Sequence, residues 1–165
     1  MKKVAIPMEE LMAVLQLQME TAGSAVLNVT GWSMLPMLHN RRDSVTICPV
    51  EARCNRGDVI LYRRKSGQYV LHRVLRRTEE GYILCGDNQF FTEKVEHDQL
   101  LAVVTGFTRK GKTYSVSHPG YRFYTGIWVF FHPVRWLYLM PRRAVGRIRT
   151  QIRHRQIRKL IKRRF

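Results

Sequence analysis

The first 24 residues carry apolar side chains at the spacing of an amphipathic helix. The apolar positions recur every three or four residues and share one face, at Met8, Leu11, Met12, Leu15, Met19 and Ala22. Pro7 suits the first turn of a helix, and Gly23 suits its end. The pattern therefore predicts a helix over residues 7–22 that packs on the rest of the chain.

From residue 25 to about residue 118, the pattern changes to short apolar runs separated by turn residues. The runs are rich in Val, Ile, Leu, Tyr and Thr and cover residues 25–29, 44–48, 59–62, 69–75, 82–85, 101–107 and 112–116. Gly, Asn, Asp and charged residues separate them. We therefore expect a mainly β fold, with a compact antiparallel β domain, an N-terminal helix and a C-terminal helical extension that is apolar and then basic.

Residues 119–141 form a strongly apolar and aromatic segment. Its length approaches that of a membrane span, but Arg122, His132, Pro133 and Arg135 interrupt it. A charge near the bilayer centre costs roughly 2.5–3.5 kcal/mol, and a proline breaks or kinks a helix. Because Trp and Tyr favour the headgroup region, the segment predicts contact with a membrane interface. The alternative is that its aromatic side chains cover a face of the sheet.

The positive charge of the chain is concentrated at its C-terminal end. Lys and Arg number 29 against 12 Asp and Glu, which gives a net charge of +17. Residues 1–98 are nearly neutral, whereas all 11 charged residues of 142–165 are basic. This distribution argues against nucleic-acid binding by the whole domain and favours a tail with its own partner. Beside an aromatic segment, we expect that partner to be anionic lipid, bound through residues 121–165; RNA or an acidic protein would match the same charges.

These patterns divide the chain into four parts. They are an amphipathic helix (1–24), a β-rich domain (25–118), an apolar interface segment (119–141) and a basic tail (142–165). No secretory signal is apparent at the N-terminus, so we expect a peripheral or monotopic membrane protein whose bulk lies on the cytoplasmic side. Cys48, Cys54 and Cys85 match no zinc-binding spacing. We expect free, packed cysteines, with one disulfide as the alternative, and neither a metal nor another cofactor.

A serine in a turn and a histidine in a strand form the candidate catalytic pair. Ser33 lies in Gly-Trp-Ser-Met-Leu-Pro at 31–36, and His72 lies in Val-Leu-His-Arg-Val at 70–74. A serine hydroxyl becomes a good nucleophile only when a neighbouring base takes its proton, and imidazole titrates near neutral pH. The sequence therefore predicts acyl transfer, with Ser33 as the nucleophile and His72 as the general base.

Four short motifs, in order along the chain, resemble those of the signal peptidase I family of serine peptidases. Residues 31–36 resemble the nucleophile box Gly-x-Ser-Met-x-Pro, and 56–60 resemble the box Arg-Gly-Asp-Val-Val. Residues 70–74 occupy the general-base box, and 86–88 match Gly-Asp-Asn. Most bacterial members have lysine as the base, so His72 is similar to the endoplasmic-reticulum type. The resemblance implies a serine endopeptidase that removes a leader or signal peptide from a precursor at a membrane surface.

The resemblance also implies an acidic residue that orients the histidine. In the histidine-type members it is an aspartate six residues after the Asp of Gly-Asp-Asn. The equivalent position in this chain is Glu93. Asp87, within the Gly-Asp-Asn motif itself, and Asp98 are rivals for the role.

The strands beside the candidate pair are expected to bind an extended peptide by main-chain hydrogen bonds. The expected contacts are Val29, Thr30, Gly31, Met34, Tyr69, Val70 and Leu71. The resemblance implies shallow pockets for small residues, such as Ala-x-Ala, before the cleaved bond. The oxyanion of acyl transfer needs hydrogen-bond donors, and the backbone N–H of Ser33 is the natural one. Some members add a serine hydroxyl two residues before the nucleophile; this chain has Gly31 there, and Thr30 is the candidate substitute. A different interpretation of Met34 is simple packing.

Two other functions fit parts of the sequence. A regulatory nucleic-acid-binding protein related to self-cleaving repressors would use the basic tail, although no helix-turn-helix precedes the β domain. A non-catalytic binding module could have the same fold, but the presence of both Ser33 and His72 argues against it. The sequence does not predict an oligomeric state.

Overall fold

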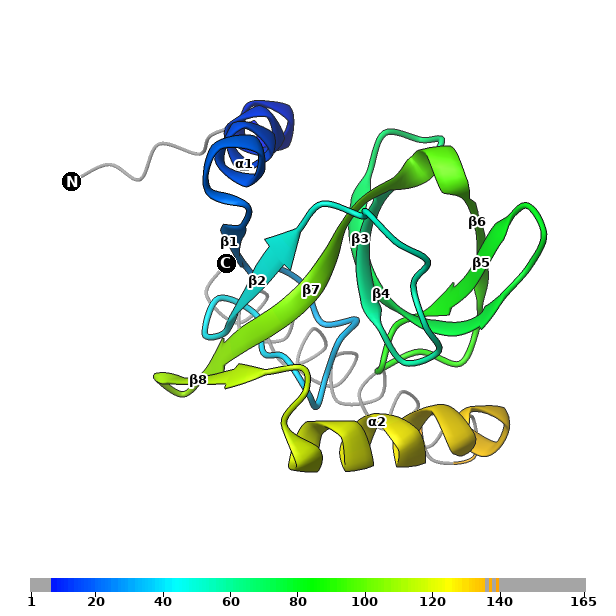
Figure 1. Cartoon of the computed structure of the whole chain (residues 1–165). Coiled ribbons are helices and arrows are strands. Elements are labelled where there is room, and N and C mark those ends of the chain that lie inside the picture. The colour runs from blue at the N-terminus through cyan, green and yellow to red at the C-terminus, as the bar shows by residue number, and fades with distance from the viewer. Residues whose placement is uncertain (1–6, 136, 138, 140–165) are drawn as a thin grey trace, which may run out of the picture.

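A curled antiparallel sheet lies between two helices in the computed structural model, which describes residues 7–135, 137 and 139 (Figure 1). Helix α1 (Met8–Ala22) precedes the first strand, β1 (Ala25–Asn28), and helix α2 (Pro119–Phe130) follows the last. The predicted fold class, mainly β with a helix on each side of the strands in sequence, is confirmed.

The eight strands form one sheet. Its other members are β2 (Ser44–Cys48), β3 (Val59–Arg63), β4 (Tyr69–Arg77), β5 (Gly81–Cys85), β6 (Glu93–Glu96), β7 (Leu100–Arg109) and β8 (Lys112–Ser115). The order is β1-β2-β7-β3-β4-β5-β6, with β8 also paired to β7. Short 3₁₀ turns occur at His97–Gln99 and His132–Val134. Because β7 pairs with β2, β3 and β8, this long strand joins the two halves of the sheet.

Helix α1 has the bounds and the packing face that the sequence predicts, but fewer residues of the predicted apolar face are buried. It begins directly after Pro7, and Gly23 ends it with a φ of 73°, in the left-handed region that favours glycine. Met12, Leu15 and Met19 are buried in the core. Met8 and Ala22, at the two ends of the predicted stripe, are exposed.

Two hydrophobic clusters form on the sheet because successive side chains of a strand point to opposite faces. On β3, Val59 and Leu61 belong to the larger cluster, which α1 and the 29–43 connection also enter. Ile60 and Tyr62 belong to the smaller cluster. The buried members of the smaller cluster are Cys54, Ile60, Tyr62, Val74, Tyr82, Leu84 and Val95. This division decides which side chains can surround His72.

The two C-terminal segments that the sequence predicts are described only in part. Helix α2 begins at Pro119, the first residue of the apolar segment. The basic tail, residues 142–165, lies outside the described residues. Among the described residues, no helix combines the length and the apolar character needed to cross a membrane. All three cysteines are free, and Cys54 and Cys85 are buried.

Candidate active site

Ser33 lies in a hydrogen-bonded turn within the connection between β1 and β2. Met34 and Leu38 anchor this turn in the larger cluster, and the Leu38 N–H donates to the Met34 carbonyl at 2.9 Å. Gly31 has a φ of 91°, which explains a glycine two residues before the serine. Ser33 itself is half-buried, and the next apolar side chain before it, Trp32, is 62% exposed.

The Gly-Asp-Asn turn at 86–88 fixes the position of the Ser33 backbone. The Asn88 N–H donates to the Ser33 carbonyl at 2.7 Å, and the Asn88 side-chain amide donates to the Trp32 carbonyl at 3.2 Å. A Cβ atom on Gly86 would lie 2.7 Å from the Ser33 carbonyl oxygen, so only glycine permits this approach. Two of the four motifs therefore meet directly.

His72 lies on β4, pairs with Ile60 of β3 and is 1% exposed. Its Nδ1 lies 3.1 Å from the Tyr62 hydroxyl, which comes from the neighbouring strand on the same face of the sheet. Burial lowers the pKa of His72 to about 4, although Glu93 and Asp87 act in the opposite direction and Arg64 lowers it further. His72 is therefore a neutral imidazole at physiological pH.

Glu93 is the carboxylate nearest to the Nδ1 side of His72. Its Oε2 accepts a hydrogen bond from the Tyr62 hydroxyl at 2.9 Å and another from Arg64 Nε at 2.8 Å. A second guanidinium nitrogen of Arg64 pairs with Oε1. The distance from His72 Nδ1 to Glu93 Oε1 is 3.6 Å, which is too long for a hydrogen bond. Although burial opposes ionisation, the hydrogen bonds from Arg64 and Tyr62 lower the pKa of Glu93.

Asp87 is paired with a different residue, on the other face of the sheet. Its carboxylate receives two hydrogen bonds from Arg73, at 2.8 and 2.7 Å, and both side chains are completely buried. Arg73 follows His72 on β4, so the two side chains point to opposite faces. Asp98, the other rival, is exposed in the 3₁₀ turn before β7. Of the three acidic candidates, Glu93 has the contacts of an orienting residue.

The pair of Arg73 and Asp87 also attaches helix α2 to the candidate site. Tyr124 donates to the Asp87 carboxylate at 3.1 Å, and the Trp128 indole donates to the Asp87 carbonyl at 3.1 Å. Arg73 in turn donates to the Tyr121 hydroxyl at 3.0 Å. The side chains on the inner face of α2 thus form hydrogen bonds with the Gly-Asp-Asn turn, and this turn also forms a hydrogen bond with the Ser33 backbone.

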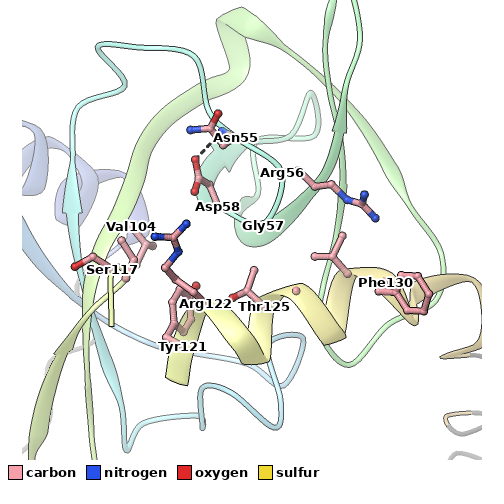
Figure 2. A pocket seen from close by; sticks show the side chains of 13 residues that line it. Asn55, Arg56, Gly57, Asp58, Val104, Ser117, Tyr121, Arg122, Thr125 and Phe130 are labelled. Carbon is pink, nitrogen blue, oxygen red and sulfur yellow. Dashed lines mark hydrogen bonds between the residues drawn. The ribbon is translucent and has the colours of Figure 1, made fainter. Parts of the chain in front are cut away.

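A cavity of about 610 Å³ lies between α2 and the loop at 55–58, on the Arg73 face of the sheet. Figure 2 shows Asp58 and Asn55 above it, Thr125 below it on α2, and Phe130 further along the helix. Arg73 donates to both the Gly57 carbonyl and the Thr125 hydroxyl beside it. His72 does not line this cavity, so the cavity is separate from the candidate catalytic pair.

Compared with known proteins, the chain matches no family model, no curated protein and no solved structure. The assignment of the site therefore depends on its own geometry.

Gly86 is the residue that relates the two catalytic candidates, Ser33 and His72, in the fold. Arg73 of β4 pairs with Cys85 of β5. Because the two strands are antiparallel, the next residue after Cys85, Gly86, lies toward His72. Gly86 also packs closely against the Ser33 carbonyl. In the part of the chain that the structure describes, the Ser33 hydroxyl has no hydrogen bond to His72. Catalytic hydrogen bonds are often long before substrate binds and tighten in the complex.

The two strands expected to bind a peptide differ in whether their main-chain N–H and C=O groups are free to accept it. β5 joins β4 only from Arg73 onward, so residues 69–72 have no strand partner on that side among the described residues. This leaves the main chain of Tyr69, Val70 and Leu71 as an edge. By contrast, the Val29 N–H donates to the Asp43 carbonyl, and the Val29 carbonyl accepts from the Arg41 N–H.

Two further expectations about the substrate site change with the structure. The Gly31 N–H already donates to the Asn40 side chain at 3.1 Å. Thr30 is exposed and lies between Val29 and Gly31, whose main-chain N–H groups already have hydrogen-bond acceptors within the protein. Met34 is 2% exposed and packs in the larger cluster. Its burial corrects the expectation of substrate contact and favours the packing interpretation.

Tyr62 and Arg64 are the site residues that the sequence analysis did not identify. Tyr62 ends an apolar run and has the pattern of a core residue, and Arg64 is in a basic turn. Their roles depend on which residue of β4 lies opposite which residue of β3, and only the structure gives that register.

Proposed function

We propose that this protein is a serine endopeptidase that removes a leader or signal peptide from a precursor, in the manner that its resemblance to signal peptidase I implies. The observation that carries the proposal is the environment of His72. The imidazole is buried and neutral, and its Nδ1 contacts a hydroxyl that is itself bonded to Glu93. An imidazole held through Nδ1 has Nε2 available as a base.

The proposed reaction proceeds through an acyl-enzyme. The substrate adds to the edge at 69–71 as an extended strand, and the Ser33 Oγ forms a bond to the scissile carbonyl carbon while His72 Nε2 takes its proton. The Ser33 backbone N–H donates to the oxyanion. The carbon–nitrogen bond then breaks, His72 returns the proton to the leaving amine, and water repeats the sequence on the ester.

Covalent labelling tests the proposed nucleophile. A peptidyl diphenyl phosphonate with alanine side chains phosphonylates an activated serine and releases phenol, and intact mass counts the adducts. We expect one adduct on the wild-type chain and none on Ser33→Ala. Ser66→Ala, which changes an exposed serine in the turn between β3 and β4, is the matched control and should be labelled like wild type. No adduct on wild type in either detergent or vesicles would contradict the proposal and favour a non-catalytic binding module.

We further propose that α2 contacts a membrane surface. Its outer face carries apolar side chains with the spacing of one helical stripe, at Phe123, Ile127 and Phe130, and the exposed Val134 continues it. Phe123 and Phe130 are 72% and 71% exposed. The 11 basic residues of 142–165 begin 12 residues after the end of α2 in the sequence. An apolar face next to a cationic segment suits an anionic bilayer.

A cluster of four arginines adds a second basic surface that would suit anionic lipid. Arg53, Arg56, Arg76 and Arg77 line one hollow of about 630 Å³. None of the four has a carboxylate within ion-pair distance among the described residues. The hollow shares Arg56 with the cavity whose lining includes Phe130. Arg56 therefore places one basic side chain across the cavity from α2, where a phosphate headgroup would be bound.

Flotation with vesicles tests this surface. We expect the full chain to float with vesicles of phosphatidylcholine and phosphatidylglycerol in equal amounts. The double variant Phe123→Ser/Phe130→Ser should bind at least roughly 10-fold more weakly, because burying one phenylalanine contributes about 1.5–3 kcal/mol. Leu17→Ser, at an exposed apolar position of α1, is the matched control. Equal binding by the double variant would contradict the proposal, and retention on DNA in place of vesicles would favour the nucleic-acid alternative.

A further inference from the structure

Tyr62 occupies the space between the candidate base and its carboxylate. Its side chain is fully buried in the smaller cluster. Its hydroxyl lies 3.1 Å from His72 Nδ1 and 2.9 Å from Glu93 Oε2. Because the direct distance from His72 Nδ1 to Glu93 Oε1 is 3.6 Å, too long for a hydrogen bond, the carboxylate acts on the imidazole through this hydroxyl.

The hydrogen-bond inventory of the three groups determines how the protons are arranged. A tyrosine hydroxyl has one hydrogen to donate, and an ionised carboxylate can only accept. Glu93 remains ionised because Arg64 pairs with it, so the Tyr62 hydrogen points to Glu93. The Tyr62 oxygen can then only accept from His72, which requires the hydrogen of the imidazole on Nδ1. Nε2 is left unprotonated, as a general base requires.

The surroundings of Tyr62 keep its own proton in place. Burial, and then the hydrogen bond to Glu93, raise the pKa of Tyr62 well above its ordinary value. Tyr62 therefore stays neutral and does not compete with His72 for the proton of Ser33. Tyr62, Arg64 and Glu93 also line a cavity of about 330 Å³, which His72 does not line.

We propose that Tyr62 is a positioning residue that transmits the orientation set by Glu93 to His72, which gives a His72–Tyr62–Glu93 relay in place of a direct histidine–carboxylate contact. This inference rests on the proposed function. When His72 Nε2 takes the proton of Ser33, the Nδ1 hydrogen stays bonded to the Tyr62 oxygen. The Glu93 charge then stabilises the imidazolium through the oriented hydroxyl, and no proton moves along the relay.

Tyr82 provides a matched control for Tyr62. It is buried in the same cluster, and its hydroxyl also has a buried partner, the Cys54 N–H at 3.1 Å. Tyr62→Phe and Tyr82→Phe therefore each remove one buried hydroxyl and one protein hydrogen bond or more, but only Tyr62→Phe removes the contact with His72. A role in packing alone would make the two variants equivalent.

Two measurements on the full chain test the relay. Nitrogen-15 NMR of labelled histidines, with the His72 signals assigned by their loss in His72→Ala, reports the tautomer. The rate of phosphonylation by the peptidyl diphenyl phosphonate reports the base. We expect an Nδ1–H tautomer in wild type and Tyr82→Phe. Tyr62→Phe should lose this preference and react roughly 10²-fold more slowly, within the range that general-base catalysis contributes.

The outcomes separate the relay from the proposed function. If Tyr62→Phe keeps the tautomer, rate and pH profile of Tyr82→Phe, the relay is wrong. If wild type is not phosphonylated, the proposed function fails, while the NMR comparison still tests the relay. Should Tyr62→Phe fail to fold, Glu93→Gln provides the second variant, because it removes the charge that orients Tyr62. An unchanged His72 tautomer and an unchanged rate in Glu93→Gln would likewise overturn the relay.

Discussion

Replacing His72 by alanine is expected to slow covalent modification of Ser33 by roughly 10⁴-fold or more. The residues of a serine nucleophile and its base act as a unit, and losing either one removes most of the chemical acceleration. His72 is the buried histidine on β4, directly after the three residues of the proposed substrate edge. His97→Ala, at an exposed histidine, should leave the rate unchanged. The measurement is the phosphonylation rate constant, followed by intact mass.

The pH dependence of the same rate provides a second test of His72. Only the neutral imidazole accepts a proton, and burial lowers the pKa of His72 to about 4. The rate should therefore be constant as the pH falls from 8 through the ordinary histidine range of about 6.5, and should fall only as the pH approaches 4. A decline centred near 6.5 would contradict the buried, neutral base, as would a similar loss of rate in His97→Ala.

Replacing Asp87 by asparagine is expected to lower the free energy of unfolding by roughly 3–5 kcal/mol, the usual cost of leaving a buried charge without its partner. Arg73 and Asp87 are both fully buried and share two hydrogen bonds. Without the carboxylate, the Arg73 guanidinium keeps its charge among hydroxyls and a carbonyl. Such a loss is a large fraction of the stability of a typical domain, about 5–15 kcal/mol. Urea denaturation of the full chain measures it.

Two further variants show whether the effect belongs to the buried pair. Asp98→Asn removes an exposed acidic side chain and should change the stability by less than about 0.5 kcal/mol. Arg73→Met/Asp87→Leu removes both charges and should be more stable than Asp87→Asn, because no unpaired charge remains. A change below about 1 kcal/mol in Asp87→Asn would show that the pair contributes little.

Most of the fold could be predicted from the sequence because its elements have clear hydrophobic periods. Helix α1 and seven of the strands, all except β6, coincide with predicted segments within a few residues. Strand β6 (Glu93–Glu96) was missed because Val95 is its only apolar residue. Its partner β5 decides its conformation, through the pairs Leu84 with Glu93 and Tyr82 with Val95, and such long-range pairing leaves no local pattern.

The candidate site could be predicted only as far as its motifs extend. Ser33, His72 and the Gly-Asp-Asn turn carry local signatures, and the structure brings the backbone of that turn to Ser33. The sequence alone could not distinguish Glu93 from Asp87 as the partner of His72. The structure distinguishes them, because the Asp87 carboxylate forms an ion pair with Arg73 on the opposite face of the sheet. Tyr62 had no signal at all, since an apolar strand that ends in tyrosine is common in hydrophobic cores.

The alternation of His72 and Arg73 on β4 has a consequence for how the strand can assemble. A shift of one residue in its pairing with β3, where Val59 lies opposite Arg73 and Ile60 opposite His72, would turn both side chains over. The guanidinium would then enter the smaller hydrophobic cluster, and Asp87 would face an imidazole. Because a misplaced buried charge costs several kcal/mol, the mispaired sheet is strongly disfavoured. A chain in which α2 contacts Asp87 therefore has the register that places His72 beside Tyr62, so the position of the helix and the candidate site depend on the same strand pairing.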